Sequence, residues 1–170
     1  MRRAALVVLG MVLVGLAASM AAPVSAQDAT PVASPAPMAT VDTTPVDGTI
    51  SFTVIDRAEN DVEIDQLPEG ASVGDLLIFA NPVFDADNQL QVGTDQGWCI
   101  LTDVAVSAWE CTWSLYLPQG QIVVQGPYLE GSDSTFAIIG GTGEFVGARG
   151  EMALTLLSDG GYVYYYQIQV

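Results

Sequence analysis

Apolar and polar residues alternate with a period of two through much of residues 48–170. The alternation is clearest in residues 109–117, where one face carries Trp109, Cys111, Trp113, Leu115 and Leu117. The other face carries Glu110, Thr112, Ser114 and Tyr116. One apolar face and one more polar face are typical of a strand in an antiparallel sheet that covers a core. No stretch of this region has a convincing helical period, so the pattern predicts an all-β domain.

Turn signals rich in glycine, proline and aspartate divide this region at regular intervals. They fall at residues 68–70, 85–88, 118–120, 131–133, 140–143 and 159–161. Between them the β-branched and aromatic runs predict eight strands, at 49–56, 74–84, 89–103, 109–117, 121–129, 135–139, 147–157 and 162–170. Eight successive hairpin-linked strands favour a closed antiparallel β-barrel, because closure removes exposed sheet edges. A two-sheet sandwich is the alternative.

The N-terminal 26 residues have the pattern of a secretory signal peptide. Arg2 and Arg3 precede an apolar run over residues 4–22, and small residues at 24–26 favour cleavage before Gln27. A membrane anchor is the competing interpretation, because the run is about long enough to span a bilayer. Glycine and alanine dilute the run and no basic flank follows it, so we expect a secreted, extracellular protein with no membrane insertion after the signal is removed.

Residues 27–47 are predicted to be a disordered linker rich in proline, alanine and threonine. Four prolines interrupt the segment and it contains no aromatic residue. Such a sequence buries too little apolar area to offset the entropy of ordering it. The domain organisation expected is therefore a signal peptide (1–26), a linker (27–47) and a β-barrel (48–170).

The charge of the chain excludes several kinds of chemistry. Twenty acidic residues face four basic ones, with no histidine and no lysine, and loss of the signal peptide leaves only Arg57 and Arg149 as bases. Catalytic triads that use histidine and Schiff bases that use lysine are therefore excluded. A net charge near −18 also makes nucleic acid an unfavourable partner. We expect no cofactor and no metal site.

The two cysteines are predicted to form a disulfide. Cys99 and Cys111 lie on adjacent predicted strands, symmetric about Ala105 in the intervening turn. An even cysteine count in an exported chain favours the bond. The alternative is a nucleophilic thiol at Cys99, which would need a nearby cation to lower its pKa.

Four stretches of the sequence resemble a known family. Residues 136–150 (FAIIGGTGEFVGARG) resemble a segment shared by allene oxide cyclases and, more loosely, by dirigent proteins. Residues 74–81, 97–100 and 124–129 are similar to the second, third and fifth strands of the cyclases. The resemblance implies an eight-stranded antiparallel barrel with an apolar cavity, often assembled as a homotrimer.

The resemblance also implies a set of cavity residues. The matching positions are Leu77, Phe79, Asn81, Cys99, Trp109 and Tyr128, and alternation adds Trp113. On the first strand, Val54 stands where the cyclases carry a glutamate and Asp56 where they carry an asparagine. Asp56 and Asn81 are therefore the catalytic candidates. A ligand carboxylate would have only Arg57 or Arg149 as a partner.

Three functions are compatible with this sequence. The first is a secreted barrel that binds a small apolar, fatty-acid-like molecule. The second is an isomerase, a cyclase or a dirigent-type protein that confines and orients a reactive molecule, which a buried carboxylate of raised pKa in the lumen would favour. The third is a structural or surface domain with a filled barrel, which a sealed interior would favour.

Overall fold

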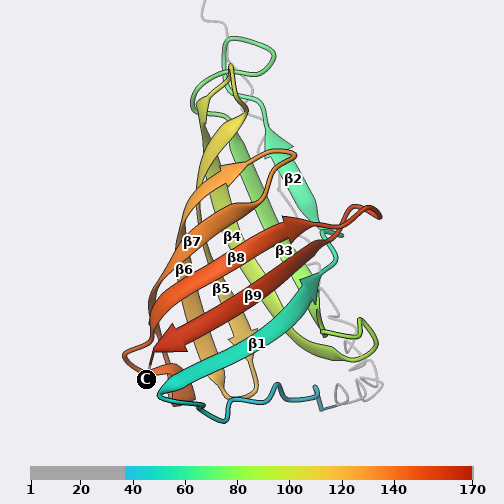
Figure 1. Cartoon of the computed structure of the whole chain (residues 1–170). Coiled ribbons are helices and arrows are strands. Elements are labelled where there is room, and N and C mark those ends of the chain that lie inside the picture. The colour runs from blue at the N-terminus through green and yellow to red at the C-terminus, as the bar shows by residue number, and fades with distance from the viewer. Residues whose placement is uncertain (1–36, 170) are drawn as a thin grey trace, which may run out of the picture. The chain divides into compact units, whose positions relative to one another are not determined.

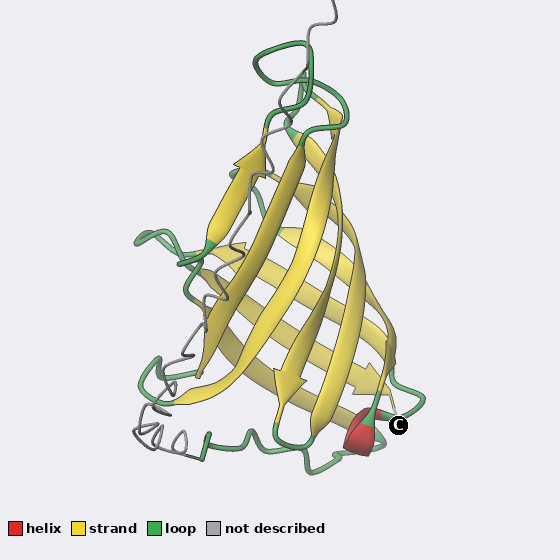
Figure 2. Cartoon of the chain, turned by 180° about the vertical axis from the view of Figure 1, so that it is seen from behind, coloured by secondary structure: helices red, strands yellow, loops and turns green. Residues whose placement is uncertain are grey.

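The computed structural model describes residues 37–169, and within them the chain is almost entirely β-structure (Figure 1). The strands are β1 (Thr49–Asp56), β2 (Asp61–Ile64), β3 (Leu76–Asp85), β4 (Gln91–Asp103), β5 (Ala108–Leu117), β6 (Gly120–Leu129), β7 (Ser134–Gly141), β8 (Arg149–Leu156) and β9 (Tyr162–Gln169). One short 3₁₀ helix, η1 (Gly143–Phe145), lies near the C-terminal end of β9 (Figure 2). The predicted signal peptide at 1–26 lies outside the described residues.

The strands close into an antiparallel barrel, which confirms the predicted fold class. Each strand from β3 to β8 pairs with the next one along the chain, and β1 pairs along its whole length with β9. The ring is completed where β1 also pairs with the C-terminal part of β3, with Val54 opposite Asp85 and Asp56 opposite Val83. Eight strands therefore form the closed barrel, and β2 is an additional ninth strand.

Strand β2 was not predicted from the sequence. It continues along β3 beyond the end of β1, with Asp61 opposite Phe79 and Ile64 opposite Leu76. All four of its residues are exposed, so it has no apolar face directed to the core. Strand β2 pairs with β3 alone and does not pair with β9.

Aromatic side chains pack against one another inside the barrel. The rings of Phe52 and Tyr166 stack with centroids 5.0 Å apart, and those of Trp113 and Phe136 meet edge-on at 4.4 Å. Gly97 lies opposite Trp113 in the β4–β5 register, and a Cβ at this glycine would lie only 2.3 Å from the Trp113 Cβ. The position of the Trp113 indole in the lumen therefore requires a glycine at residue 97 of the neighbouring strand.

The barrel end nearest η1 is covered by residues 37–47 and by Phe145. Phe145 is fully buried, and Ala39 and Val41 pack against the core. The Ala39 N–H donates to the Gln91 carbonyl, and the Gln119 side chain donates to the Val41 carbonyl. This half of the predicted linker thus contacts the barrel, and residues 27–36 lie outside the described part. Among residues 37–169, no helix is long and apolar enough to cross a membrane.

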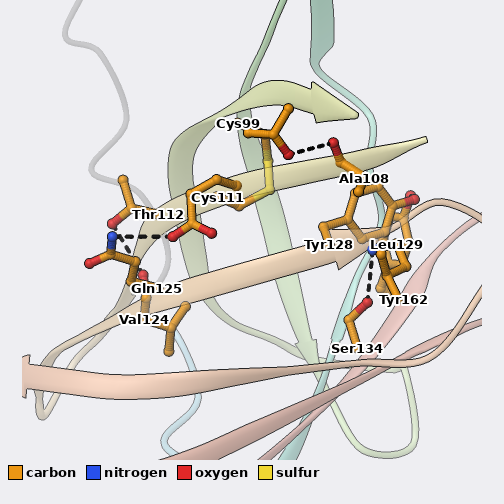
Figure 3. The surroundings of a disulfide bond; sticks show 12 residues. Cys99, Ala108, Cys111, Thr112, Val124, Gln125, Tyr128, Leu129, Ser134 and Tyr162 are labelled. Carbon is orange, nitrogen blue, oxygen red and sulfur yellow. Dashed lines mark hydrogen bonds between the residues drawn. A yellow bond between two sulfur atoms is a disulfide. The ribbon is translucent and has the colours of Figure 1, made fainter. Parts of the chain in front are cut away.

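The predicted disulfide is confirmed. Cys99 on β4 and Cys111 on β5 are directly opposite each other and their sulfurs are bonded (Figure 3). Both residues are buried, and their side chains face the lumen. The bond ties the two central strands of the β3–β6 meander together and removes Cys99 as a nucleophile.

Removing the disulfide is expected to lower the free energy of unfolding by about 2–3 kcal/mol, because it releases a short loop in the unfolded chain. Urea unfolding of the wild type with and without a reductant would measure this loss. The Cys99→Ala/Cys111→Ala variant is the control, because its unfolding midpoint should not respond to reductant. A wild-type midpoint that reductant leaves unchanged would contradict the prediction.

Candidate functional site

A small cavity of about 30 Å³ lies inside the barrel, towards the end that carries β2. Six of the predicted site residues line it together with Asp56: Leu77, Phe79, Asn81, Cys99, Trp113 and Tyr128. Its remaining lining residues are Asp61, Cys111, Phe136, Leu154, Tyr162 and Tyr164. Trp109, which the resemblance places in the cavity, instead lines a separate pocket nearer the surface. The inner cavity has room for a water molecule but not for an extended hydrocarbon chain.

Asp56 is a buried carboxyl group in the wall of this cavity. It ends β1, faces inward like Phe52 and Val54, and is 2% exposed. One carboxylate oxygen accepts a hydrogen bond from the Tyr164 hydroxyl at 3.0 Å, and the other accepts one from the Ala58 N–H at 3.1 Å. Burial raises the pKa of Asp56 to about 6, although these two hydrogen bonds oppose the rise. Asp56 therefore titrates close to neutral pH.

Asn81, the second catalytic candidate, holds the chain between β1 and β2. Its side chain is buried, and its carbonyl oxygen accepts a hydrogen bond from the Asn60 N–H at 2.8 Å. Its amide nitrogen donates to the Asp61 carboxylate at 2.9 Å. Because both ends of the amide have protein partners, Asn81 positions residues 60 and 61 at the cavity wall.

Asp95 is a buried carboxyl group that the sequence analysis did not single out. It lies on β4, is 1% exposed, and neither of its carboxylate oxygens has a hydrogen-bond partner. Burial, followed by the charge of Asp56, raises the pKa of Asp95 well above its usual value. A signal was available, because Asp95 is four residues before the inward-facing Cys99 and alternation places both side chains on one face.

Tyr164 and Tyr166 of β9 lie near these carboxyl groups and differ in their hydrogen bonding. Both are buried, but the Tyr164 hydroxyl donates to Asp56 while the Tyr166 hydroxyl has no partner. The charge of Asp95 contributes, after burial, to raising the pKa of each tyrosine. The indole N–H of Trp113 is likewise buried without a partner.

This difference makes a matched pair of variants informative. Tyr166→Phe is expected to leave the free energy of unfolding unchanged or raise it by about 1 kcal/mol, because it removes a buried hydroxyl with no partner. Tyr164→Phe is expected to lower it by about 1 kcal/mol at pH 7.5, because the Asp56 carboxylate loses a donor. Urea unfolding of both variants measures the difference, and equal effects would contradict the assignment.

An outer pocket of about 280 Å³, which we call the vestibule, adjoins the inner cavity. It is lined by Asp61, Glu63, Leu77, Trp109, Tyr128, Glu130 and Tyr162, and four of these residues also line the inner cavity. The hydroxyl groups of Tyr128 and Tyr162 lie 3.1 Å apart (Figure 3). These two tyrosines border both spaces, so a molecule in the vestibule contacts residues that also line the cavity of Asp56.

The charged residues around these pockets are acids. Arg57 pairs with Asp159 at 2.9 Å, and Arg149 donates to the carbonyls of Ile139 and Ala148. Neither arginine lines the inner cavity or the vestibule. Over residues 37–169, no group of three or more Cys, Asp or Glu side chains is placed to hold a metal ion. The chemistry that the site offers is therefore proton transfer by carboxyl groups and confinement by aromatic walls.

Comparison with known proteins agrees with this architecture. The family model described as allene oxide cyclase matches residues 53–167, more than half of the chain. A pyocyanin demethylase structure aligns with 24% identity and a TM-score of 0.63, over 69% of this chain and 99% of that one. The exo-specific intermolecular Diels–Alderase AbnU aligns with 14% identity and a TM-score of 0.58, over 72% and 98%. A pterocarpan synthase dirigent protein aligns with 19% identity and a TM-score of 0.54, over 71% and 91%. The chain belongs to the allene oxide cyclase family.

Proposed function

We propose that this barrel is an isomerase or cyclase for a small apolar molecule that carries a carbonyl or epoxide oxygen. The observation that carries the proposal is the buried Asp56 carboxyl, hydrogen-bonded to Tyr164 in the wall of an aromatic cavity. Asp56 serves as the proton donor and acceptor. The vestibule holds the substrate, and the aromatic side chains fix its orientation.

The ionisation of Asp56 suits this role. A carboxyl group with a pKa of about 6 is present in both protonation states near neutral pH, so it accepts and returns a proton with little cost. The Tyr164 hydroxyl fixes the orientation of the carboxyl group. In a protein that only carries an apolar ligand, two buried carboxyl groups would lower the stability of the fold without contributing to binding. The names of the aligned demethylase and Diels–Alderase, both enzymes acting on small organic molecules, also support a catalytic barrel.

A structural barrel is the second candidate, and the small volume of the inner cavity favours it. Trp113 makes ring contacts with Phe79, Phe136 and Tyr164, and these leave about 30 Å³ unfilled. A fatty-acid-like ligand, as the resemblance implies, needs these rings to move aside. A compact ring molecule needs only the vestibule and a displacement of Tyr128 or Tyr162.

Isomerisation of cyclohex-3-en-1-one to its conjugated isomer tests the catalytic proposal. Asp56 would take a proton from the carbon between the carbonyl and the double bond and return it to the far end of the resulting dienolate, so that no co-reactant is needed. The conjugated product is followed by its ultraviolet absorbance. The rate should rise with pH through about 6, and Asp56→Asn should lower it by about 10²- to 10⁴-fold.

Asp87→Asn is the matched control, because Asp87 is an exposed acid in the turn between β3 and β4, outside both pockets. It should keep the wild-type rate. A rate that Asp56→Asn leaves unchanged, or a wild-type rate no greater than that of free carboxylate, would contradict the proposal and favour the structural barrel.

We also propose that the protein is exported and assembles as a homotrimer. A buried disulfide supports export, because such bonds persist in oxidising compartments. An apolar groove on the outer face of β3–β5 supports assembly, with Ile78 and Trp98 42% and 44% exposed. Light scattering coupled to size-exclusion chromatography should give three subunits for the wild type and a smaller species for Trp98→Gln. A monomeric wild type would contradict assembly.

A further inference from the structure

We propose that the vestibule selects organic cations, so that the substrate combines an aromatic or apolar ring system with an amine or an alkylated ring nitrogen. This inference rests on the proposed function, because it names the substrate class of the same site. It departs from the fatty-acid-like ligand that the family resemblance implies, since that ligand carries a negative charge.

Carboxylates enter the vestibule from two sides. Asp61 and Glu63 lie on β2, and Glu130 directly follows β6. All three side chains are exposed. The described residues that line the vestibule include no arginine, so nothing there balances these charges. A second pocket of about 510 Å³ shares Glu63 and Glu130 and adds further acids, so the negative field extends across this end of the barrel.

Aromatic side chains form the walls between these acids. Trp109, Tyr128 and Tyr162 line the vestibule, and the rings of Tyr128 and Tyr162 meet edge-on with centroids 6.1 Å apart. Burial and the hydrogen bond with Tyr162 raise the pKa of Tyr128, and the charges of Glu130 and Asp61 raise it further. The negative field therefore reaches the aromatic wall. Aromatic faces beside carboxylates are the surroundings that organic cations prefer.

The inner cavity continues the vestibule into the barrel. Asp61, Leu77, Tyr128 and Tyr162 line both spaces, and Trp113 lines the inner one and is 4% exposed. A ring system that displaces Tyr128 or Tyr162 therefore meets an aromatic wall, while its cationic end stays beside the carboxylates of the vestibule.

Binding of three isosteric probes tests this inference without any turnover. The probes are N-methylquinolinium (a cation), quinoline (neutral near pH 7.5) and quinoline-6-carboxylate (an anion), titrated into the full chain by fluorescence. We expect the cation to bind about 10-fold more tightly than quinoline at low salt and the anion to bind least. The preference should shrink in 0.5 M salt, because these carboxylates are exposed.

Charge reversal supplies the decisive comparison. Glu63→Lys/Glu130→Lys should invert the order, so that the anion binds best. Asp87→Lys/Glu151→Lys makes the same change of charge at exposed positions outside the vestibule and should keep the wild-type order. Equal affinity of the wild type for cation and quinoline, or an order that the vestibule variant does not change, would overturn the inference.

The outcome is separable from that of the proposed function. Asp56→Asn should lower the rate of isomerisation by about 10²- to 10⁴-fold and keep the cation preference, because Asp56 lines the inner cavity and not the vestibule. Cation preference without any isomerisation would support the binding site and contradict the catalytic role. Isomerisation without cation preference would support the catalytic role and contradict the cation-binding site.

Discussion

The free energy of unfolding is expected to fall as the pH rises from about 4 to about 7. Asp56 has a pKa of about 6 in the folded protein, against a usual value of 3.8, so the folded state binds more protons across this interval. Its stabilising contribution is complete below the unfolded pKa and is lost as the pH rises through the folded one. The loss from Asp56 is on the order of 3 kcal/mol. Burial of Asp95 acts in the same direction.

The interval between pH 4 and pH 7 isolates this effect. Hydrogen bonds lower the pKa of Asp42, Asp75 and Asp159, so their contributions are lost only as the pH falls below about 4. Urea unfolding at several pH values should therefore show a dependence opposite to that of ordinary acid denaturation.

Asp56→Asn identifies the source of this pH dependence. The variant should be more stable than the wild type at pH 7 and should show a flatter profile, retaining only the part due to Asp95. Asp87→Asn is the control, because Asp87 is an exposed carboxylate outside both pockets. A wild-type stability that is constant or rises over this interval, or a profile that Asp56→Asn leaves unchanged, would contradict the burial of a charged group at this position.

Alternation within strands and the regular turn signals were sufficient to predict the barrel, whereas Asp56 became a candidate through the family resemblance. Phe52, Val54 and Asp56 share one face of β1, so a carboxyl group at the end of an apolar series follows the apolar residues into the lumen. The disulfide was predicted from the symmetric hairpin and the even cysteine count, and Cys99 does lie opposite Cys111. Strand β2 was not predicted because its four residues are all exposed and show no alternation of buried and exposed positions.

The shape of the site depends on features that the alternation of apolar and polar residues does not determine. Trp109 faces inward as predicted but lies close to the barrel end, and therefore lines the vestibule instead of the inner cavity. The volume of the cavity depends on how the rings of Trp113, Phe136 and Tyr164 pack across the lumen. Such contacts between distant strands are set by side-chain rotamers in three dimensions, which the order of residues alone does not specify.

Trp113→Ala is expected to lower the free energy of unfolding by about 3–5 kcal/mol, because it empties the centre of the aromatic core. The Trp113 ring contacts three other aromatic rings, and the residue is 4% exposed. Trp98→Ala is the matched control on the neighbouring strand. Because Trp98 is 44% exposed on the outer face, its loss should cost much less in a monomer. Similar costs for the two variants would contradict the packing described for the lumen.

Indole added to the Trp113→Ala variant distinguishes a rigid barrel from one that opens. The variant should bind indole in the vacated space, and at 100 times the dissociation constant the gain in stability is about 2.7 kcal/mol. Wild-type protein whose Tm indole does not change has a lumen that stays closed to a compact aromatic molecule, as a structural barrel requires. A wild-type Tm that rises with indole shows that Tyr128 and Tyr162 move aside for a guest. Access of this kind is what proton transfer to or from Asp56 requires, since Asp56 lines the inner cavity and not the vestibule.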